Sequence, residues 1–286
     1  ARPAGALEER TGQMSEAEAY PKGELMKGRR GLVMGVANKN SIAWSIAQQL
    51  HAQGAEIAFT YLNEAMERRV RPLAESLNAP VIVECDVMSD APMDAALAAV
   101  AARGPTNDVP VHAIAFTDKE ALEGSFVDNT SRQNFKDTMD VSAYSFVDAA
   151  KRSAKMMPNG GSMVTLTYLG SERTIPNYNV MGVAKAALEA SMRYIARDLG
   201  PAGIRVNAIS AGPIRTLAGG GISCGPHIFS FNRKGGPLRA IDAVAGVAGA
   251  ALYLLSDLGL SCTGETLHVD AGFHIVGMPD EAALKE

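Results

Sequence analysis

The sequence predicts a single doubly wound α/β domain built on a seven-stranded parallel sheet. From residue 31 onward, apolar strand-like runs alternate with segments whose apolar residues recur at helical spacing. The strand-like runs are almost continuously apolar, as is typical of parallel strands that are buried on both faces. No repeat or internal linker divides the 286 residues, and α/β domains of this size commonly form one unit.

Seven segments have strand character, and helical segments separate them. The strands are expected at 31–37, 55–60, 81–87, 109–116, 161–168, 203–210 and 264–271. The helices are expected at 41–54, 63–78, 90–103, 131–157, 178–199 and 241–256. Pro72 is expected to kink or divide the second helix, because proline removes a backbone hydrogen bond. This order implies right-handed crossovers and a Rossmann-like sheet with helices on both faces.

The folded domain is expected at 28–278, with one segment on either side of it and a distinct segment within it. Residues 1–27 are polar, contain two prolines and lack an apolar period, so we expect a flexible N-terminal arm in which Met14 is a candidate natural start. Residues 279–286 form a short C-terminal tail. Segment 212–237 contains seven glycines and three prolines, which predicts a mobile lid.

Composition excludes several classes of function. The formal charge of −4 gives no reason to expect nucleic-acid binding, and no apolar run approaches the length of a membrane span. The three cysteines are widely spaced and form no CxxC pair, which favours a reduced, cytoplasmic setting. The five histidines lack ligand spacing, so no metal is expected. His112 and Trp44 are expected in the core.

Ligands of such sheets bind beyond the carboxyl ends of the strands, where the strand order reverses. Gly35 and Ser41 follow the first strand, and the start of the next helix offers unpaired N–H groups to a pyrophosphate. The sequence lacks GxGxxG, so a plain strand-to-helix turn remains an alternative. Asp86 and Val87 end the third strand, where a carboxylate suits an adenine amino group, although a solvated aspartate that caps the next helix is an alternative. The second strand ends without an acid, so charge does not choose between NADH and NADPH.

Tyr178 and Lys185 lie seven residues apart on one predicted helix. Seven residues make almost two turns, so both side chains point in nearly the same direction, about 10 Å apart along the axis. A ribose and a nicotinamide fit that gap. The lysine lowers the cost of negative charge, and the phenol can bond an oxygen on which charge develops. A second tyrosine, Tyr168, ends the fifth strand at the same edge.

Three segments together resemble a known family. They are TYLGSERTIPNYNVMGVAKAALEA, RVNAISAGPIRT and GVANKNSIAWSIA. They are similar to the enoyl-[acyl-carrier-protein] reductases of bacterial type II fatty-acid synthesis, within the short-chain dehydrogenase/reductase superfamily. The resemblance covers roughly residues 23–278. Most of the superfamily places the lysine four residues after the tyrosine, where this chain has Gly182, so the longer spacing and Tyr168 indicate the enoyl reductase branch.

The resemblance implies a reaction and a set of site residues. Hydride passes from NADH, or NADPH, to the β-carbon of a trans-2-enoyl thioester in fatty-acid elongation. Tyr178 bonds the thioester oxygen, Lys185 anchors the nicotinamide ribose and Tyr168 lines the pocket beside the thioester. The implied cofactor contacts are Gly35, Ser41, Ile42, Leu62, Asp86, Val87, Ile114, Lys185, Ile214, Arg215, Thr216, Leu217 and Ala218. The implied substrate contacts are Thr117, Tyr168, Tyr178, Met181 and Ile222, with Phe229 as a further apolar candidate.

The sequence departs from the family pattern in two places. Leu62 stands where the family usually has a glutamine after the second strand. Cys224, Gly225 and Pro226 stand where relatives commonly have an aspartate, an aromatic residue and an arginine. Acyl chain length, the closed form of the lid and inhibitor sensitivity are therefore left open.

The resemblance also implies partners, which are an acyl carrier protein and three further copies of the chain in a homotetramer. Between Leu199 and Ile241 there is no acid, whereas five basic residues occur: Arg205, Arg215, Arg233, Lys234 and Arg239. A basic rim would attract an acidic carrier, although an ordinary solvated surface has the same composition. Two other functions stay open, namely a carbonyl reductase of the same superfamily and a catalytically silent nucleotide-binding protein.

Overall fold

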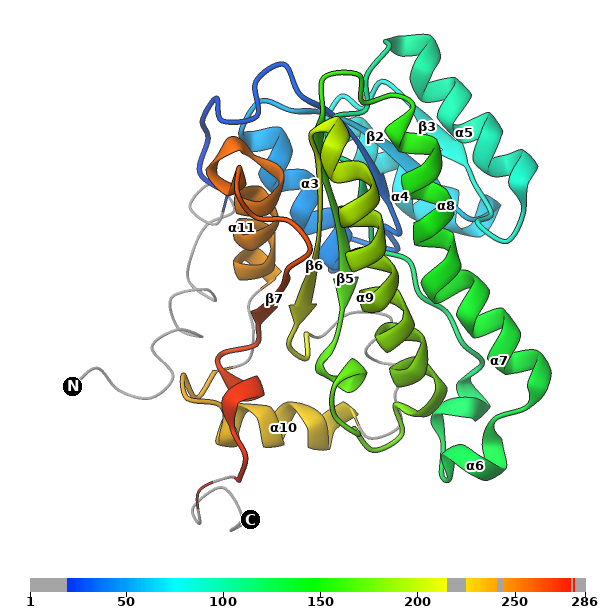
Figure 1. Ribbon diagram of the computed structural model, residues 1–286, viewed down its shortest axis with the longest axis vertical. Coiled ribbons are helices and arrows are strands. Elements are labelled where there is room, and N and C mark those ends of the chain that lie inside the picture. The colour runs from blue at the N-terminus through cyan, green and yellow to red at the C-terminus, as the bar shows by residue number, and fades with distance from the viewer. Residues whose placement is uncertain (1–19, 215–224, 241–243, 279, 281–286) are drawn as a thin grey trace.

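The computed structural model describes residues 20–214, 225–240, 244–278 and 280. Its centre is a seven-stranded sheet in the order β3-β2-β1-β4-β5-β6-β7, in which every neighbouring pair is parallel. The sheet lies between two layers of helices (Figure 1). The predicted fold class is therefore confirmed.

The strands occupy the predicted apolar segments but are shorter. They are β1 (Arg30–Met34), β2 (Glu56–Tyr61), β3 (Ile82–Glu84), β4 (Val111–His112), β5 (Gly161–Thr167), β6 (Ile204–Ala211) and β7 (Thr266–Val269). The strand order reverses between β1 and β4, because β2 and β3 extend the sheet on one side and β5 to β7 on the other. This reversal is where a ligand is expected.

Both faces of the sheet need a layer of helices, because β1 has apolar side chains on both faces. Val33 joins an apolar cluster with helices α3 (Ile42–Ala52), α4 (Glu64–Ser76) and α11 (Val244–Leu255). Leu32 and Met34 point the other way, because side chains alternate along a strand. They join a cluster with helices α5 (Asp90–Arg103) and α8 (Ser145–Ala154), and helix α9 (Asn179–Leu199) packs beside α8.

The last crossover differs in hand from the others. The steps β5 to β6 and β6 to β7 cross the sheet in the same direction, but α9 packs on the face of α8 and α11 on the face of α3. The two crossovers must therefore have opposite hands, so the prediction that all are right-handed is wrong for β6-α11-β7. The connection at 212–265 is long and includes helix α10 (Gly225–Gly235), so strand twist does not constrain its hand as in a tight βαβ unit.

Three predicted segments differ in detail. The helix expected at 63–78 runs uninterrupted through Pro72 to Ser76, so the expected division is wrong; the proline lies on the exposed face. The segment expected at 131–157 comprises α7 (Arg132–Met139), a π-helical turn (Asp140–Tyr144) and α8, with the short helix α6 (Phe126–Asn129) before it. Part of the glycine-rich segment 212–237 forms α10.

The packed region begins ahead of the boundary expected at residue 28. Met26 is fully buried, the Tyr20 hydroxyl lies 2.7 Å from Ser45 Oγ on α3, and the side-chain amide of Gln53 donates to Pro21 O. Residues 1–19 lie outside the described part of the chain. Within the described residues, no helix is both long and apolar enough to span a bilayer.

Candidate active site

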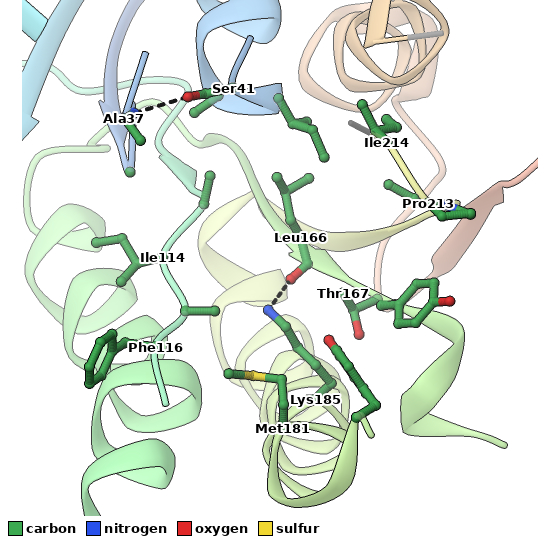
Figure 2. Close-up of a pocket in the computed structure, with 18 of the residues that line it drawn as sticks. Ala37, Ser41, Ile114, Phe116, Leu166, Thr167, Met181, Lys185, Pro213 and Ile214 are labelled. Atoms are coloured by element: carbon green, nitrogen blue, oxygen red, sulfur yellow. Dashed lines mark hydrogen bonds between the residues drawn. The ribbon is translucent and has the colours of Figure 1, made fainter. Parts of the chain in front are cut away.

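A cavity of about 460 Å³ lies at the carboxyl ends of β1, β4, β5 and β6, where the strand order reverses. Figure 2 shows Ser41 at one end, Lys185 and Met181 rising from α9 at the other, and Pro213 and Ile214 along one side. The residues expected at the site that line this cavity are Gly35, Ser41, Ile42, Ile114, Thr117, Tyr168, Tyr178, Met181, Lys185, Ile214 and Phe229.

The turn after β1 forms one end of the cavity. Gly35 has a positive φ of 97°, and a Cβ there would lie 2.1 Å from the Ala113 carbonyl oxygen, so only glycine fits between β1 and β4. Ser41 Oγ accepts hydrogen bonds from the N–H groups of Ala37 and Asn38 at 3.0 and 2.9 Å, which fixes the loop. Ser41 makes no side-chain bond to the first turn of α3, and that turn contains no acid.

This end of the cavity therefore suits an anion. The first N–H groups of a helix have no intrahelical partner and carry the positive end of the helix dipole. Because Ser41 Oγ already accepts two hydrogen bonds, its O–H is the group that remains to donate to a phosphate. The turn fits the pyrophosphate of a dinucleotide without a GxGxxG sequence.

Tyr178 and Lys185 enter the cavity from the same helix. Tyr178 occupies the N-cap position of α9 and Lys185 lies two turns along, so that both side chains line the same cavity, as the common direction predicted from their spacing requires. Both residues are buried. Lys185 Nζ donates a 2.8 Å hydrogen bond to the carbonyl oxygen of Leu166, the dashed bond in Figure 2. Burial lowers the pKa of Lys185 to about 8, against the opposing effect of Glu189. The ammonium form thus still predominates at neutral pH.

Tyr178 is held as a neutral phenol. Burial raises its pKa well above the ordinary value for tyrosine, and Tyr168 and Glu189 add to the shift. The rings of Tyr168 and Tyr178 meet edge to face with centroids 5.0 Å apart. A neutral phenol is a hydrogen-bond donor, and the Lys185 charge in the same cavity favours an anionic acceptor.

Two glycines allow the close packing that positions the Tyr178 ring. A Cβ at Gly170 would lie 2.3 Å from Cδ1 of Tyr178, and a Cβ at Gly182 would lie 2.7 Å from the Gly170 carbonyl oxygen. The position four residues after the tyrosine therefore packs against the loop after β5 and has no room for a side chain. A lysine at that position would not fit in this structure.

The wall after β4 contains residues that sequence reasoning missed. Phe116 lines the cavity, and its backbone N–H and carbonyl both bond Ser142 Oγ at 3.0 Å. The hydroxyl of Thr138 donates to Thr117 Oγ1 at 2.7 Å, and the Asn134 amide donates to the same oxygen at 3.1 Å. The only sequence signal for these contacts was a polar residue at every fourth position, namely Asn134, Thr138 and Ser142. The π-helical turn that aims Ser142 at Phe116 left no recognisable pattern.

The model of one family, described as Enoyl-(Acyl carrier protein) reductase, matches residues 35–274, which include the β1 turn, Tyr178 and Lys185. The chain belongs to this family. It is 55% identical over 261 residues to "Enoyl-[acyl-carrier-protein] reductase [NADH] 2" of Rhizobium meliloti, a match that covers 91% of this chain and 97% of that protein.

Solved structures of other reductases have the same fold. The enoyl-acyl-carrier-protein reductase of Anaplasma phagocytophilum, solved in complex with NAD, is 52% identical with a TM-score of 0.87, covering 91% of this chain and 98% of that one. The Bacillus cereus reductase, solved with NADP+ and an indole naphthyridinone, is 47% identical with a TM-score of 0.87, covering 89% of this chain and 100% of that one.

Several residues expected at the reductase site lie outside the cavity. Leu62 follows β2 and is 50% exposed. Asp86 and Val87 follow β3; Asp86 Oδ1 accepts the Met88 N–H at 3.0 Å, and Val87 is buried. These three positions lie along the same sheet edge, Leu62 after the strand next to β1 and Asp86 and Val87 after the strand beyond it. Arg215, Thr216, Leu217, Ala218 and Ile222 lie outside the described residues.

The basic stretch of the reductase does not form one rim. Arg205 donates to the carbonyl oxygens of Leu254, Ser256 and Cys262, so it holds the loop after α11 and is not available for docking. Arg239 pairs with Asp280. Arg233 and Lys234 lie in the last turn of α10, and Arg233 is exposed. The expectation of a five-residue rim is therefore wrong for Arg205.

His112 and Trp44 lie in the core of the reductase, as expected. His112 is buried between Ser145 and Thr165, at 2.8 Å from Ser145 Oγ and 3.1 Å from Thr165 Oγ1. Burial lowers its pKa to about 3, so the ring is neutral. Ser145 donates its proton to Val141 O, so it accepts from His112 Nε2–H, which fixes the tautomer. Trp44 is 5% exposed and contacts Phe59.

Proposed function

We propose that this chain reduces trans-2-enoyl thioesters carried by acyl carrier protein to saturated acyl thioesters, with NADH as the hydride donor. One observation carries the proposal. Tyr178 and Lys185 project from one helix into a single cavity at the reversal point of the sheet, in a chain that belongs to the enoyl-(acyl carrier protein) reductase family. Relatives named as NADH-dependent reductases and a neighbour solved with NAD support the choice of cofactor.

The cofactor would extend along the carboxyl edge of the sheet. Gly35, Ser41 and Ile42 would hold the pyrophosphate at the start of α3, and Ile114 and Ile214 would flank the nicotinamide end. We assign Leu62, Asp86 and Val87 to the adenosine end because they follow β2 and β3 along the same edge. Arg215, Thr216, Leu217 and Ala218 follow Ile214 in sequence and complete the proposed set. Leu62 offers no hydrogen bond to the adenosine.

The chemistry follows from the donors around the cavity. When bound, the reduced nicotinamide supplies a hydride to the β-carbon of the enoyl chain. Negative charge then develops on the thioester oxygen, and the neutral Tyr178 phenol would donate a hydrogen bond to it. A proton from solvent, taken up at the α-carbon, would complete the saturated thioester. Lys185 would bond the nicotinamide ribose and place positive charge beside that oxygen. Tyr168 would orient Tyr178 through their ring contact and line the thioester subsite.

The acyl chain would lie against the apolar part of the cavity. Met181, Ile228 and Phe229 line it together with Thr117. We propose that segment 212–237 closes over the acyl chain as a lid. Its described parts, residues 212–214 and α10, border the cavity. Ile222, within this segment, is proposed as a further contact.

Arg233 and Lys234, in the last turn of α10, are proposed to dock the acidic carrier protein. The double variant Arg233→Glu, Lys234→Glu should raise KM for carrier-bound substrate and leave KM for a crotonyl-coenzyme A thioester unchanged. Equal effects on both substrates would reject the docking role. Arg205→Glu is unsuitable as a probe, because that side chain bonds three carbonyl oxygens.

Assembly and location complete the proposal. We propose a homotetramer, because Tyr144, Val183 and Tyr194 leave large apolar groups exposed on the π-helical turn and α9. A stable monomer in sedimentation would refute it. We place the enzyme in the cytoplasm, consistent with a family of type II fatty-acid synthesis and with Cys85 and Cys262 as free thiols.

The test is substrate selection. Purified protein should oxidise NADH with crotonyl thioester and show no activity with a 3-oxoacyl thioester; parallel assays with NADPH measure coenzyme preference. Activity on the 3-oxoacyl thioester alone would instead indicate a carbonyl reductase. Binding of NADH without turnover of either substrate would indicate a catalytically silent nucleotide-binding protein.

A further inference from the structure

The backbone on both sides of Tyr178 is in an unusual conformation. Asn177 has a φ of 61° and Asn179 a φ of 42°, so two of the five non-glycine residues with positive φ in the described chain adjoin this tyrosine. Asparagine tolerates the left-handed region better than most residues, but the conformation is still unfavourable and persists only when its surroundings impose it. Such positions concentrate at functional sites.

The side chain of Asn179 identifies what imposes this conformation. Its Nδ2 donates to the Ala121 carbonyl oxygen at 3.1 Å and to the Gly124 carbonyl oxygen at 3.4 Å. Ala121 belongs to the short 3₁₀ turn Lys119–Leu122, whose two end residues line the cavity. One amide therefore links the start of α9 to the opposite wall of the cavity.

Tyr178 packs directly against that wall. Leu122 is buried in one apolar cluster with Tyr178, Met181 and Ala184. Any movement of the Lys119–Leu122 turn away from α9 would loosen this cluster and free the Tyr178 ring. The hydrogen bond from the Asn179 amide to this turn opposes such a movement from the helix side.

We propose that Asn179 is a positioning residue for reduction. Its left-handed backbone fixes the direction from which Tyr178 enters the cavity, and its amide holds the Lys119–Leu122 turn against Tyr178 and the bound enoyl chain. The inference rests on the proposed role of Tyr178. It assigns Asn179 no contact with substrate, cofactor or reacting atoms.

Three variants separate the backbone from the amide. Asn179→Asp keeps the shape and removes the N–H donor, Asn179→Gly removes the side chain but accepts the positive φ, and Asn179→Ala loses both features. With crotonyl-coenzyme A, the Asp and Gly variants should lower kcat about tenfold, because a small misplacement of a reacting group is costly. They should raise KM for the thioester several-fold and leave the Kd of NADH unchanged. Asn179→Ala should have a lower kcat than Asn179→Gly.

Asn78 provides the matched control. It lies two residues after the end of α4 with a φ of 54°, is exposed, and lies outside the cavity lining. Asn78→Gly and Asn78→Ala should shift Tm without changing kcat or either KM. A change of kcat in these variants as large as that at Asn179 would show that loss of backbone preference alone reduces activity, and would overturn the proposal.

Two other results would overturn it. Asn179→Asp and Asn179→Gly could retain the wild-type kcat and KM and differ only in Tm, which would leave Asn179 a purely structural role. Loss of NADH binding in parallel with kcat would indicate collapse of the site. The Tyr178→Phe variant keeps the two proposals distinguishable. If Tyr178→Phe is impaired and the Asn179 variants are not, only the positioning role fails; if the wild-type chain reduces no enoyl thioester, the proposed function fails.

Discussion

The variant Gly170→Ala tests whether close packing against Gly170 fixes the position of the Tyr178 ring. An added Cβ would lie 2.3 Å from Cδ1 and 2.7 Å from Cε1 of Tyr178, whereas ordinary van der Waals contact begins at 3.4 Å. The ring must therefore retreat by about 1 Å, or the loop after β5 must shift by as much. Misplacement of a catalytic group by 1 Å can cost about 10²-fold in rate, so kcat should fall by that order.

The assay is steady-state oxidation of NADH with crotonyl-coenzyme A, beside a fluorescence titration of NADH binding and a thermal melt. We expect kcat to fall, the Kd of NADH to stay within about twofold, and the free energy of unfolding to fall by about 1–3 kcal/mol from overpacking. Gly200→Ala is the control, since a Cβ there meets no atom within 4 Å. A Gly170→Ala variant with wild-type kcat would refute the proposed seating of Tyr178.

Three further predictions concern Lys185, Arg205 and Cys85. Because burial lowers the pKa of Lys185 to about 8, kcat/KM should decline as pH rises through 8 and the ammonium is lost. Between about pH 8 and 10.5, Lys185 binds fewer protons in the folded chain than in the unfolded chain. The contribution of Lys185 to the free energy of unfolding should therefore rise across that window. Urea titrations of the wild type and of Lys185→Met would measure this rise. Arg205→Met should lose about 3 kcal/mol of stability in urea denaturation, because its guanidinium bonds three carbonyl oxygens, with kcat unchanged. The Cys85 thiol, whose pKa burial raises to about 11, should resist iodoacetamide at pH 8 until the chain unfolds, and Cys262 should be alkylated before it, as mass spectrometry would detect.

The fold was predictable because burial imposes a simple pattern on parallel strands. The apolar runs at 161–168 and 203–210 coincide closely with β5 and β6, since both strands are covered on both faces. Residues 109–116 form a strand of only two residues, because the chain bends away after His112 to build the cavity wall. The hand of the last crossover was not predictable, since it depends on the path of a long connection.

The candidate site likewise has one part that the sequence predicts and another part that only the folded structure creates. The spacing of Tyr178 and Lys185 fixes their common direction through helix geometry alone, so the sequence sufficed to pair them. The seat of the Tyr178 ring depends on Gly170, which contacts it only after the loop following β5 folds back. The π-helical turn that presents Ser142 to Phe116 arises from tertiary packing and has no local signature.

The most direct test is the turnover of Tyr178→Phe, measured with NADH and crotonyl-coenzyme A at saturating concentrations of both. If the phenol donates a hydrogen bond to the developing oxyanion, kcat should fall on the order of 10²-fold. The Kd of NADH should stay unchanged, because we assign ribose binding to Lys185. A Tyr178→Phe enzyme with wild-type kcat would contradict the role that we assign to the Tyr178 and Lys185 pair.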